Sequence, residues 1–350
     1  MAYTTINKSS DYFNTKLYTG NGGAAGGTQT ITGIPFAPNW TWIKNRAAGE
    51  HHVLTDAVRG ANKQLNTNRN NAELSLTTQL TAFTSDGFSV GVGSEVNGDG
   101  NGMVSWNWKA NGQGSSNTAG SINTTYTSAN TTSGFSISTY TGTGSNATIG
   151  HGLGVKPSMI ICKKLNTTGS WITYHSALGA TKYLYLDTTD AEAANSTVWQ
   201  DIEPTTSVFS VGSASNCNAS GSTYVAYCFA EKTGFSKFGS YIGTGNVDGT
   251  FCYTGFKPAW VMIKCSSAAN DEWFIWDSKR LGYNGGNNNF FADTQDVEST
   301  ATASGFDMLS NGFKLRTTDT ALNGSGRTYI YMAFAEAPLV GSNNVPATAR

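Results

Sequence analysis

Short apolar runs, separated by turns rich in glycine and small polar residues, make up most of this chain. The segment 328–336, TYIYMAFAE, is apolar at nearly every position, so both of its alternating faces are apolar. Successive side chains of a strand point to opposite faces, so this pattern predicts a central strand covered on both sides. Segments 70–80 and 191–200 are polar and weakly periodic, and we expect loops there with at most one helical turn. The pattern predicts an all-β protein.

The same phrases occur three times in the same order. Each copy opens with a Tyr-x-Gly-x-Gly phrase, at 18–22, 140–144 and 241–245. A proline then leads into an apolar run that ends in lysine, at 38–44, 157–163 and 258–264. Each copy closes on an apolar strand, at 103–110, 223–231 and 328–336. Shared order and spacing indicate an internal repeat of about 100 residues, which is long enough to bury a core.

The repeat predicts three tandem antiparallel β-sandwich domains of the jelly-roll or lectin-like type. The domains are expected at 1–110, 134–231 and 232–338. Residues 111–133 are rich in Gly, Ser, Asn and Thr and are expected to form an extended linker. Only Lys232 and Thr233 join the second and third copies, which should therefore pack closely. Residues 339–350 are expected to be a flexible or docking tail.

Composition narrows the possible partners. The net charge is -1 and charged residues are 13%, against a usual level of roughly 25%, so we expect no nucleic acid and no anionic membrane as a partner. No apolar run reaches the roughly 18 residues that a membrane span needs, and no signal peptide is visible. The five cysteines are odd in number and lack a CxxC pair, which predicts free, mostly buried thiols and synthesis in a reducing cytosol.

Candidate chemistry is sparse. The adjacent His51 and His52 point to opposite faces of a strand and lack a third ligand, so we expect no metal site. The run that begins at Asn97 resembles half of a calcium loop, but its twelfth position is Trp108 rather than Glu. No nucleophile elbow, P-loop, dinucleotide fingerprint or carboxylate pair is apparent. We therefore expect no catalytic residues, no cofactor and no enzyme activity.

Two recurring charged pairs are the weak candidates for ligand binding. They are Asp56 with Arg59 and Asp277 with Arg280, each placed in a turn. Either pair could pin its turn locally or hold a sugar or a neighbouring subunit. The second copy has His175 at the aspartate position, which weakens the functional interpretation. The nine tryptophans fall mostly in predicted strands, where core packing is the default and sugar stacking or subunit contact is the alternative.

Several phrases resemble a repeat family of virion proteins from marine tailed bacteriophages. The resemblance spans about residues 11–336 and is carried by five phrases in particular: DAVRG at 56–60, SDGFSVG at 85–91, WNWKA at 106–110, YVAYCFAE at 224–231 and LSNGFKLR at 309–316. Such proteins are described as tail, tail-fibre or concanavalin-like, which implies a lectin-like sandwich and a structural or host-recognition role. The resemblance transfers no catalytic residue.

These observations lead to three functional hypotheses. The first is a bacteriophage tail fibre, spike or adhesion protein, made in the host bacterial cytoplasm and located in the virion. The second is a capsid decoration or head-fibre protein, and the third is a carbohydrate-binding module. Expected partners are other virion proteins, further copies of the chain (a trimer is possible) and a host surface glycan. Low surface charge combined with many aromatic residues suits burial in an assembly.

Overall fold

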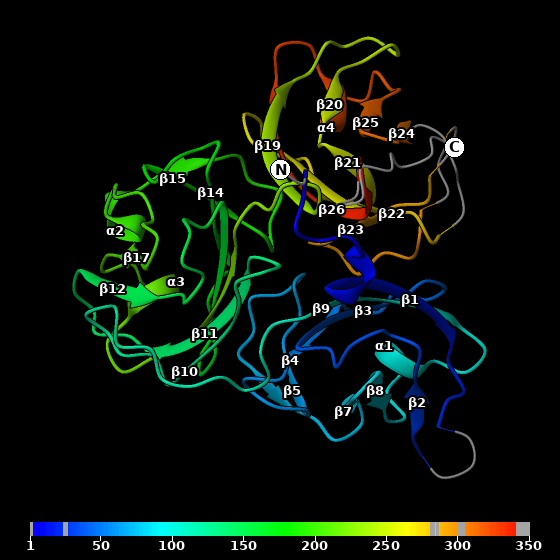
Figure 1. Cartoon of the computed structure of the whole chain (residues 1–350). Helices are drawn as coiled ribbons and strands as arrows, with labels where there is room; N and C mark the ends of the chain where they lie inside the picture. Colours follow the sequence, from blue (N-terminus) through cyan, green and yellow to red (C-terminus); the bar gives the residue numbers. More distant parts are fainter. Residues whose placement is uncertain (1–2, 24–26, 281–283, 285–286, 300–304, 341–350) are drawn as a thin grey trace.

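A computed structural model of the whole chain describes residues 3–23, 27–280, 284, 287–299 and 305–340. Strands dominate these residues, and the α-helices are single four-residue turns (Figure 1). The all-β prediction is confirmed. None of the helices in the described ranges has the length and apolarity that crossing a bilayer requires.

The elements of the first copy are η1 (Ser9–Asp11), β1 (Phe13–Thr19), β2 (Gln29–Ile31), β3 (Trp40–Asn45), β4 (Val53–Asp56), β5 (Lys63–Gln64), β6 (Leu74–Ser75), β7 (Leu80–Thr84), β8 (Gly87–Val90), α1 (Ser94–Asn97) and β9 (Gly102–Trp108). Those of the second copy are β10 (Tyr126–Asn130), β11 (Phe135–Thr141), β12 (Ala147–Gly150), β13 (Met159–Lys164), β14 (Ile172–His175), β15 (Lys182–Tyr185), β16 (Ala193–Ala194), α2 (Ser196–Trp199), β17 (Val208–Val211), α3 (Ser215–Asn218) and β18 (Thr223–Phe229). Those of the third copy are β19 (Ser236–Ile242), β20 (Phe251–Tyr253), β21 (Phe256–Cys265), β22 (Trp273–Asp277), β23 (Phe290–Phe291), β24 (Phe306–Leu309), β25 (Gly312–Leu315), α4 (Thr320–Asn323) and β26 (Thr328–Pro338).

Each copy has a main antiparallel sheet with the same core order of strands. The shared order is β1-β9-β3-β4 in the first copy, β11-β18-β13-β14 in the second and β19-β26-β21-β22 in the third. A smaller sheet covers one face of each main sheet: β2-β8-β7, β12-β17 and β20-β25-β24 respectively. In the first copy, Ile43 of the main sheet and Phe88 of the small sheet share one apolar cluster. The repeat seen in the sequence is therefore a repeat of topology.

The opposite faces of the three main sheets share one central aromatic core. Trp40 and Trp108 of the first copy pack there with Phe229 of the second and with Trp260 and Phe334 of the third. Figure 1 shows the three copies around this centre, the first in blue and cyan, the second in green and the third in yellow to red. Both faces of each main sheet are thus buried, as the doubly apolar closing strands predict.

Equivalent hydrogen bonds join each copy to the one before it, and the first copy to the third. The lysine that ends each apolar run is buried, and its Nζ donates to a main-chain carbonyl of the neighbouring copy. These bonds are Lys44 to Gln295 (3.2 Å), Lys163 to Asn70 (3.4 Å) and Lys264 to Thr189 (3.2 Å). An aromatic ring nitrogen makes a second set: His52 to Phe291, Trp171 to Asn66 and Trp273 to Tyr185, all at 2.9 Å.

A third set of bonds runs between main chains at the same three joints. The amide nitrogens of Glu73, Glu192 and Glu298 donate to the carbonyl oxygens of Leu165, Ser266 and Arg46 at 2.8, 2.8 and 3.1 Å. Each copy therefore uses one surface to contact its predecessor and a different surface to contact its successor. Such head-to-tail contacts close into a ring when the rotation between units allows it. Here three units within one chain form a closed ring with approximate threefold symmetry.

The segment expected to be a linker, 111–133, belongs to the second copy. Its strand β10 pairs along β11, and Ile122 forms a parallel bridge with Ile149 and lies in the core of that copy. Of the expected tail, 339–350, only Leu339 and Val340 lie within the described residues, and the Leu339 amide donates to the Gly255 carbonyl at 3.3 Å. All five cysteines are free and buried, as the sequence predicts.

Candidate functional site

The candidate pair Asp56 and Arg59 lies in the joint between the first and second copies. Asp56 Oδ1 accepts from the amides of Val58 and Arg59, and Oδ2 accepts from Arg59 Nε at 2.6 Å. The same Oδ2 accepts from the hydroxyl of Tyr227 in the second copy at 2.7 Å. Arg59 also pairs with Glu73 at 2.9 Å. The pair is buried, and its charges and lone pairs are used inside the protein.

Asp277 and Arg280 repeat this arrangement between the third copy and the first. Asp277 Oδ1 accepts from the amides of Lys279 and Arg280, and Oδ2 accepts from Arg280 Nε at 2.6 Å. Trp106 Nε1 of the first copy donates to the same Oδ2 at 2.9 Å. Trp106 and Tyr227 hold equivalent positions, because each is paired with the third residue of the neighbouring strand, Trp42 of β3 or Ile161 of β13. Both pairs are therefore joints between copies rather than open binding sites.

His175 occupies the same position in the second copy for a physical reason. The residue equivalent to Trp106 and Tyr227 is Met332, which lines the same small cavity as His175 and whose side chain has no N–H or O–H to donate. His175 instead donates from Nε2 to the main-chain oxygen of Tyr331 at 3.1 Å, and its Nδ1 accepts from the Ala177 amide. Burial lowers the pKa of His175 to about 4, so the ring is neutral. The second copy thus has histidine instead of aspartate at this position because the neighbouring copy offers a carbonyl acceptor there instead of a side-chain donor.

The other polar candidates are also held within the fold. His52 accepts from Trp42 Nε1 at 2.8 Å on Nδ1 and donates to the Phe291 carbonyl, and burial lowers its pKa. Asn97, which begins the calcium-like run, donates to the Gly91 carbonyl and accepts from the Asn21 amide. Within the described ranges, no group of three or more His, Cys, Asp or Glu side chains is placed to hold a metal ion.

All nine tryptophans are buried, each at most 2% exposed. Seven of them line the shared central core, namely Trp40, Trp42, Trp106, Trp108, Trp171, Trp260 and Trp273. Core packing is therefore their role, and the alternative of exposed sugar stacking is wrong for this chain. Subunit contact is the other alternative for the tryptophans. Within this chain they make a comparable contact, because the shared core joins the three copies.

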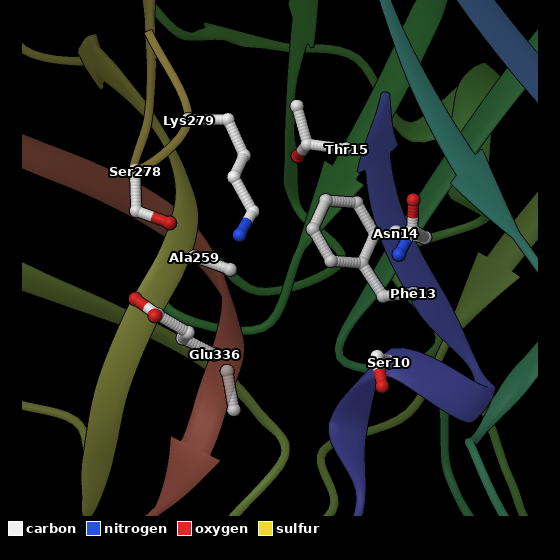
Figure 2. A pocket seen from close by; sticks show the side chains of 9 residues that line it. Ser10, Phe13, Asn14, Thr15, Ala259, Ser278, Lys279 and Glu336 are labelled. Carbon is white, nitrogen blue, oxygen red and sulfur yellow. The ribbon is translucent and has the colours of Figure 1, made fainter. Parts of the chain in front are cut away.

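A pocket with space for about 90 Å³ opens at the joint between the third and first copies (Figure 2). Its lining residues come from the start of the first copy and from β21, β26 and the turn after β22: Ser10, Phe13, Asn14, Thr15, Ala259, Ser278, Lys279, Ala335 and Glu336. We call it the seam pocket. Figure 2 shows Lys279 and Glu336 on one side of this space, with Phe13 and Thr15 on the other.

The seam pocket breaks the symmetry of the ring through one residue. Thr15 is paired with Trp106, and the residues paired with the equivalent Tyr227 and Met332 are Ile137 and Phe238. Those larger apolar side chains are buried at the other two joints. Thr15 is smaller and polar, so it leaves space at its own joint. Alignment of the copies against each other is the sequence signal that finds this position, and the sequence-based candidates did not include it.

The polar atoms of the seam pocket suit a small hydroxylated group. The hydroxyls of Thr15 and Ser278 are buried and have no hydrogen-bond partner within the described structure. The carboxylate of Glu336 is held by Lys257 Nζ at 2.9 Å, and the exposed Lys279 adds a positive charge. Phe13 supplies an aromatic surface beside these groups. Hydroxyls, charged groups and an apolar ring are the groups that binding pockets use to fix a polar ligand.

One family model matches residues 8–338, and its description is Domain of unknown function (DUF7483). The match covers all three copies, so the whole ring corresponds to a single family unit. No curated protein and no solved structure matches the chain.

Proposed function

We propose that this chain, which belongs to the DUF7483 family, is a non-catalytic structural component of a bacteriophage particle: a tail fibre, spike or adhesion protein that acts by assembly and host-surface binding. The observation that carries the proposal is that the recurring polar residues join the three copies to each other. Buried joints of this kind favour a rigid body. A surface low in charge suits burial against other proteins, and the resemblance of several phrases to those of bacteriophage virion proteins supports a place in the particle.

Localisation within intact particles tests this proposal. Bacteriophage particles from a culture that produces the chain are labelled with an antibody against it and imaged by electron microscopy. We expect label at the tail, in low and symmetric copy number. Dense label over heads would instead support capsid decoration, and absence of label from particles would overturn both virion hypotheses.

Carbohydrate binding is the second candidate, and the seam pocket is the specific observation that favours it. The purified chain is tested on an array of bacterial surface glycans together with the variant Thr15→Ile, which introduces the residue of the second copy and fills the pocket. Thr19→Ile, an exposed position on the same strand, is the matched control. We expect binding by the wild type and by Thr19→Ile, and loss of binding in Thr15→Ile. Glycan release that disappears on mutation of one acidic residue would show that the chain is an enzyme.

A further inference from the structure

The small sheets of the three copies end in equivalent edge strands. One residue of each edge strand is paired with the phenylalanine of the next strand: Ile31 with Phe88, Ile149 with Phe209, and Cys252 with Phe313. On this alignment, Phe251 and Tyr253 of β20 correspond to Thr148 and Gly150 of β12. The three edges can therefore be compared residue by residue.

In the second copy this edge is covered by an added segment of the chain. The Ile122 amide donates to the Thr148 carbonyl at 3.0 Å, and the Thr148 amide donates to Ser121 Oγ at 2.8 Å. Ile122 runs parallel to Ile149 and is 7% exposed. The segment comes from residues 111–133, which precede the second copy. The fold thus contains its own example of a parallel strand segment added at this edge.

In the part of the chain that the structure describes, the third copy has no such segment of its own. Only Lys232 and Thr233 precede it, and this connection is too short to reach back across the copy. The Leu315 amide donates to Thr250 O at 3.1 Å, and the Thr254 amide donates to Asn311 O at 3.0 Å.

These bonds direct the backbone groups of residues 250, 252 and 254 toward β25. Because backbone direction alternates along a strand, those of Phe251 and Tyr253 face away from the sheet. No described residue covers this side of β20 with a ladder like the one on β12.

The side chains at this edge are large and exposed. Phe251 and Tyr253 are 42% and 52% exposed, where the second copy has threonine and glycine. Ile242 and Val247, at 55% and 61%, lie on the same copy, and Thr250 Oγ1 donates to the Ile242 carbonyl at 2.7 Å, which ties the end of β19 to β20. Exposed apolar side chains beside unpaired backbone groups are the two features that strand addition uses.

We propose that β20 binds an extended segment of a partner protein, added parallel to the strand with an aliphatic residue beside Cys252. The partner segment has the chemistry of residues 117–122, NTAGSI, namely small polar residues followed by one aliphatic residue. A second copy of this chain fits less well, because two β20 edges related by a twofold axis would run antiparallel, whereas the example in the second copy is parallel. This inference does not depend on where in a particle the chain resides.

The test uses the full chain and a fluorescent peptide of residues 115–124, SSNTAGSINT, as the probe. The variant Phe251→Pro removes an outward-facing amide and leaves the ladder to β25 in place. Thr30→Pro, at the equivalent position of the first copy, is the matched control. We expect saturable binding by the wild type and by Thr30→Pro, and binding at least about tenfold weaker in Phe251→Pro, because a hydrogen bond and an aromatic contact are lost.

Hydrogen exchange of the wild type keeps the test decisive if the proline variant misfolds. The peptide should slow exchange of the Phe251 and Tyr253 amides and leave the Ile122 amide unchanged. Absence of binding by the wild type, or equal binding by Phe251→Pro, overturns the proposal. Light scattering that shows a dimer abolished by Phe251→Pro also overturns it, since the occupant is then a second copy.

Discussion

The indole nitrogen of Trp106 donates a hydrogen bond of 2.9 Å to the carboxylate of Asp277, and this contact joins the third copy to the first. Tyr227 makes the corresponding bond to Asp56 at 2.7 Å. The third joint uses His175 with a main-chain oxygen. One turn position therefore connects all three copies, and its residue type depends on what the next copy offers. Considered within the second copy alone, His175 looks like the loss of a functional aspartate. In the structure it matches the hydrogen-bonding groups of the third copy.

Replacing Asp277 with asparagine should destabilise the whole chain. The substitution removes the negative charge that Arg280 Nε contacts at 2.6 Å and leaves that buried guanidinium with Glu298 as its remaining ion-pair partner. Breaking a buried pair from one side costs about 3–5 kcal/mol. We expect Asp277→Asn to lower the free energy of unfolding in urea by about 3 kcal/mol. The exposed Asp201→Asn is the control and should change it by less than about 0.5 kcal/mol.

Asp293 should make stability depend on pH. Its Oδ1 accepts from the Trp273 amide at 3.0 Å, and burial raises its pKa to about 7. The folded protein holds a proton that the unfolded chain releases above about pH 4, so this contribution to stability falls as pH rises from about 4 to 7. Asp293→Asn retains the acceptor and removes the titration. Relative to the wild type, the free energy of unfolding of Asp293→Asn should increase by about 2 kcal/mol as the pH is raised from 5 to 8.

The first and second copies supply the controls for that measurement. Asn68 accepts from the His52 amide at the equivalent position, so asparagine fits this site. Asp187 accepts from the Trp171 amide, and burial raises its pKa to about 6. Asp187→Asn should therefore show a smaller gain that is complete at a lower pH. Equal pH profiles of the wild type and Asp293→Asn in urea unfolding would contradict the expectation.

A single copy should not fold alone. The segment 111–231 contains the complete second-copy sheet, but its residues Trp171, Tyr227 and Phe229 pack in the core shared with the other copies. Separation exposes this apolar face to water. We expect the isolated segment to bind a hydrophobic dye and to show poor amide dispersion in NMR spectra. The full chain should unfold in one calorimetric transition with equal calorimetric and van't Hoff enthalpies, and three resolved transitions would argue against a shared core.

The thiols should be inert until the chain unfolds. Burial raises the pKa of Cys162 to about 12, and the other four cysteines are also free and buried. The thiolate is the reactive form, so both access and ionisation are suppressed. We expect negligible reaction with a thiol reagent in native buffer and reaction of all five cysteines in guanidinium. Rapid labelling of the native chain at any cysteine would show that its local structure opens.

The closing strands follow in part from their own local pattern. In 328–336, alternating apolar residues indicate burial on both faces, and the structure places Tyr329 in the core of the third copy and Phe334 in the shared core. The pattern indicates that a face is covered, but it does not identify the cover. For the same reason, the polar composition of 111–133 indicates an extended segment but not its addition to the sheet of the second copy as β10.

By itself, the sequence determined the all-β class, the threefold repeat of strands and the burial of the tryptophans and cysteines, because these follow from local periodicity and composition. Only the tertiary structure decided that Asp56 and Asp277 join neighbouring copies, that Thr15 opens a pocket and that no described residue adds a strand to the outer edge of β20. The contacts of Asp56 and Asp277 each join residues 171 positions apart. All three findings depend on which segments meet in the folded chain, and such pairing is not encoded in any local pattern.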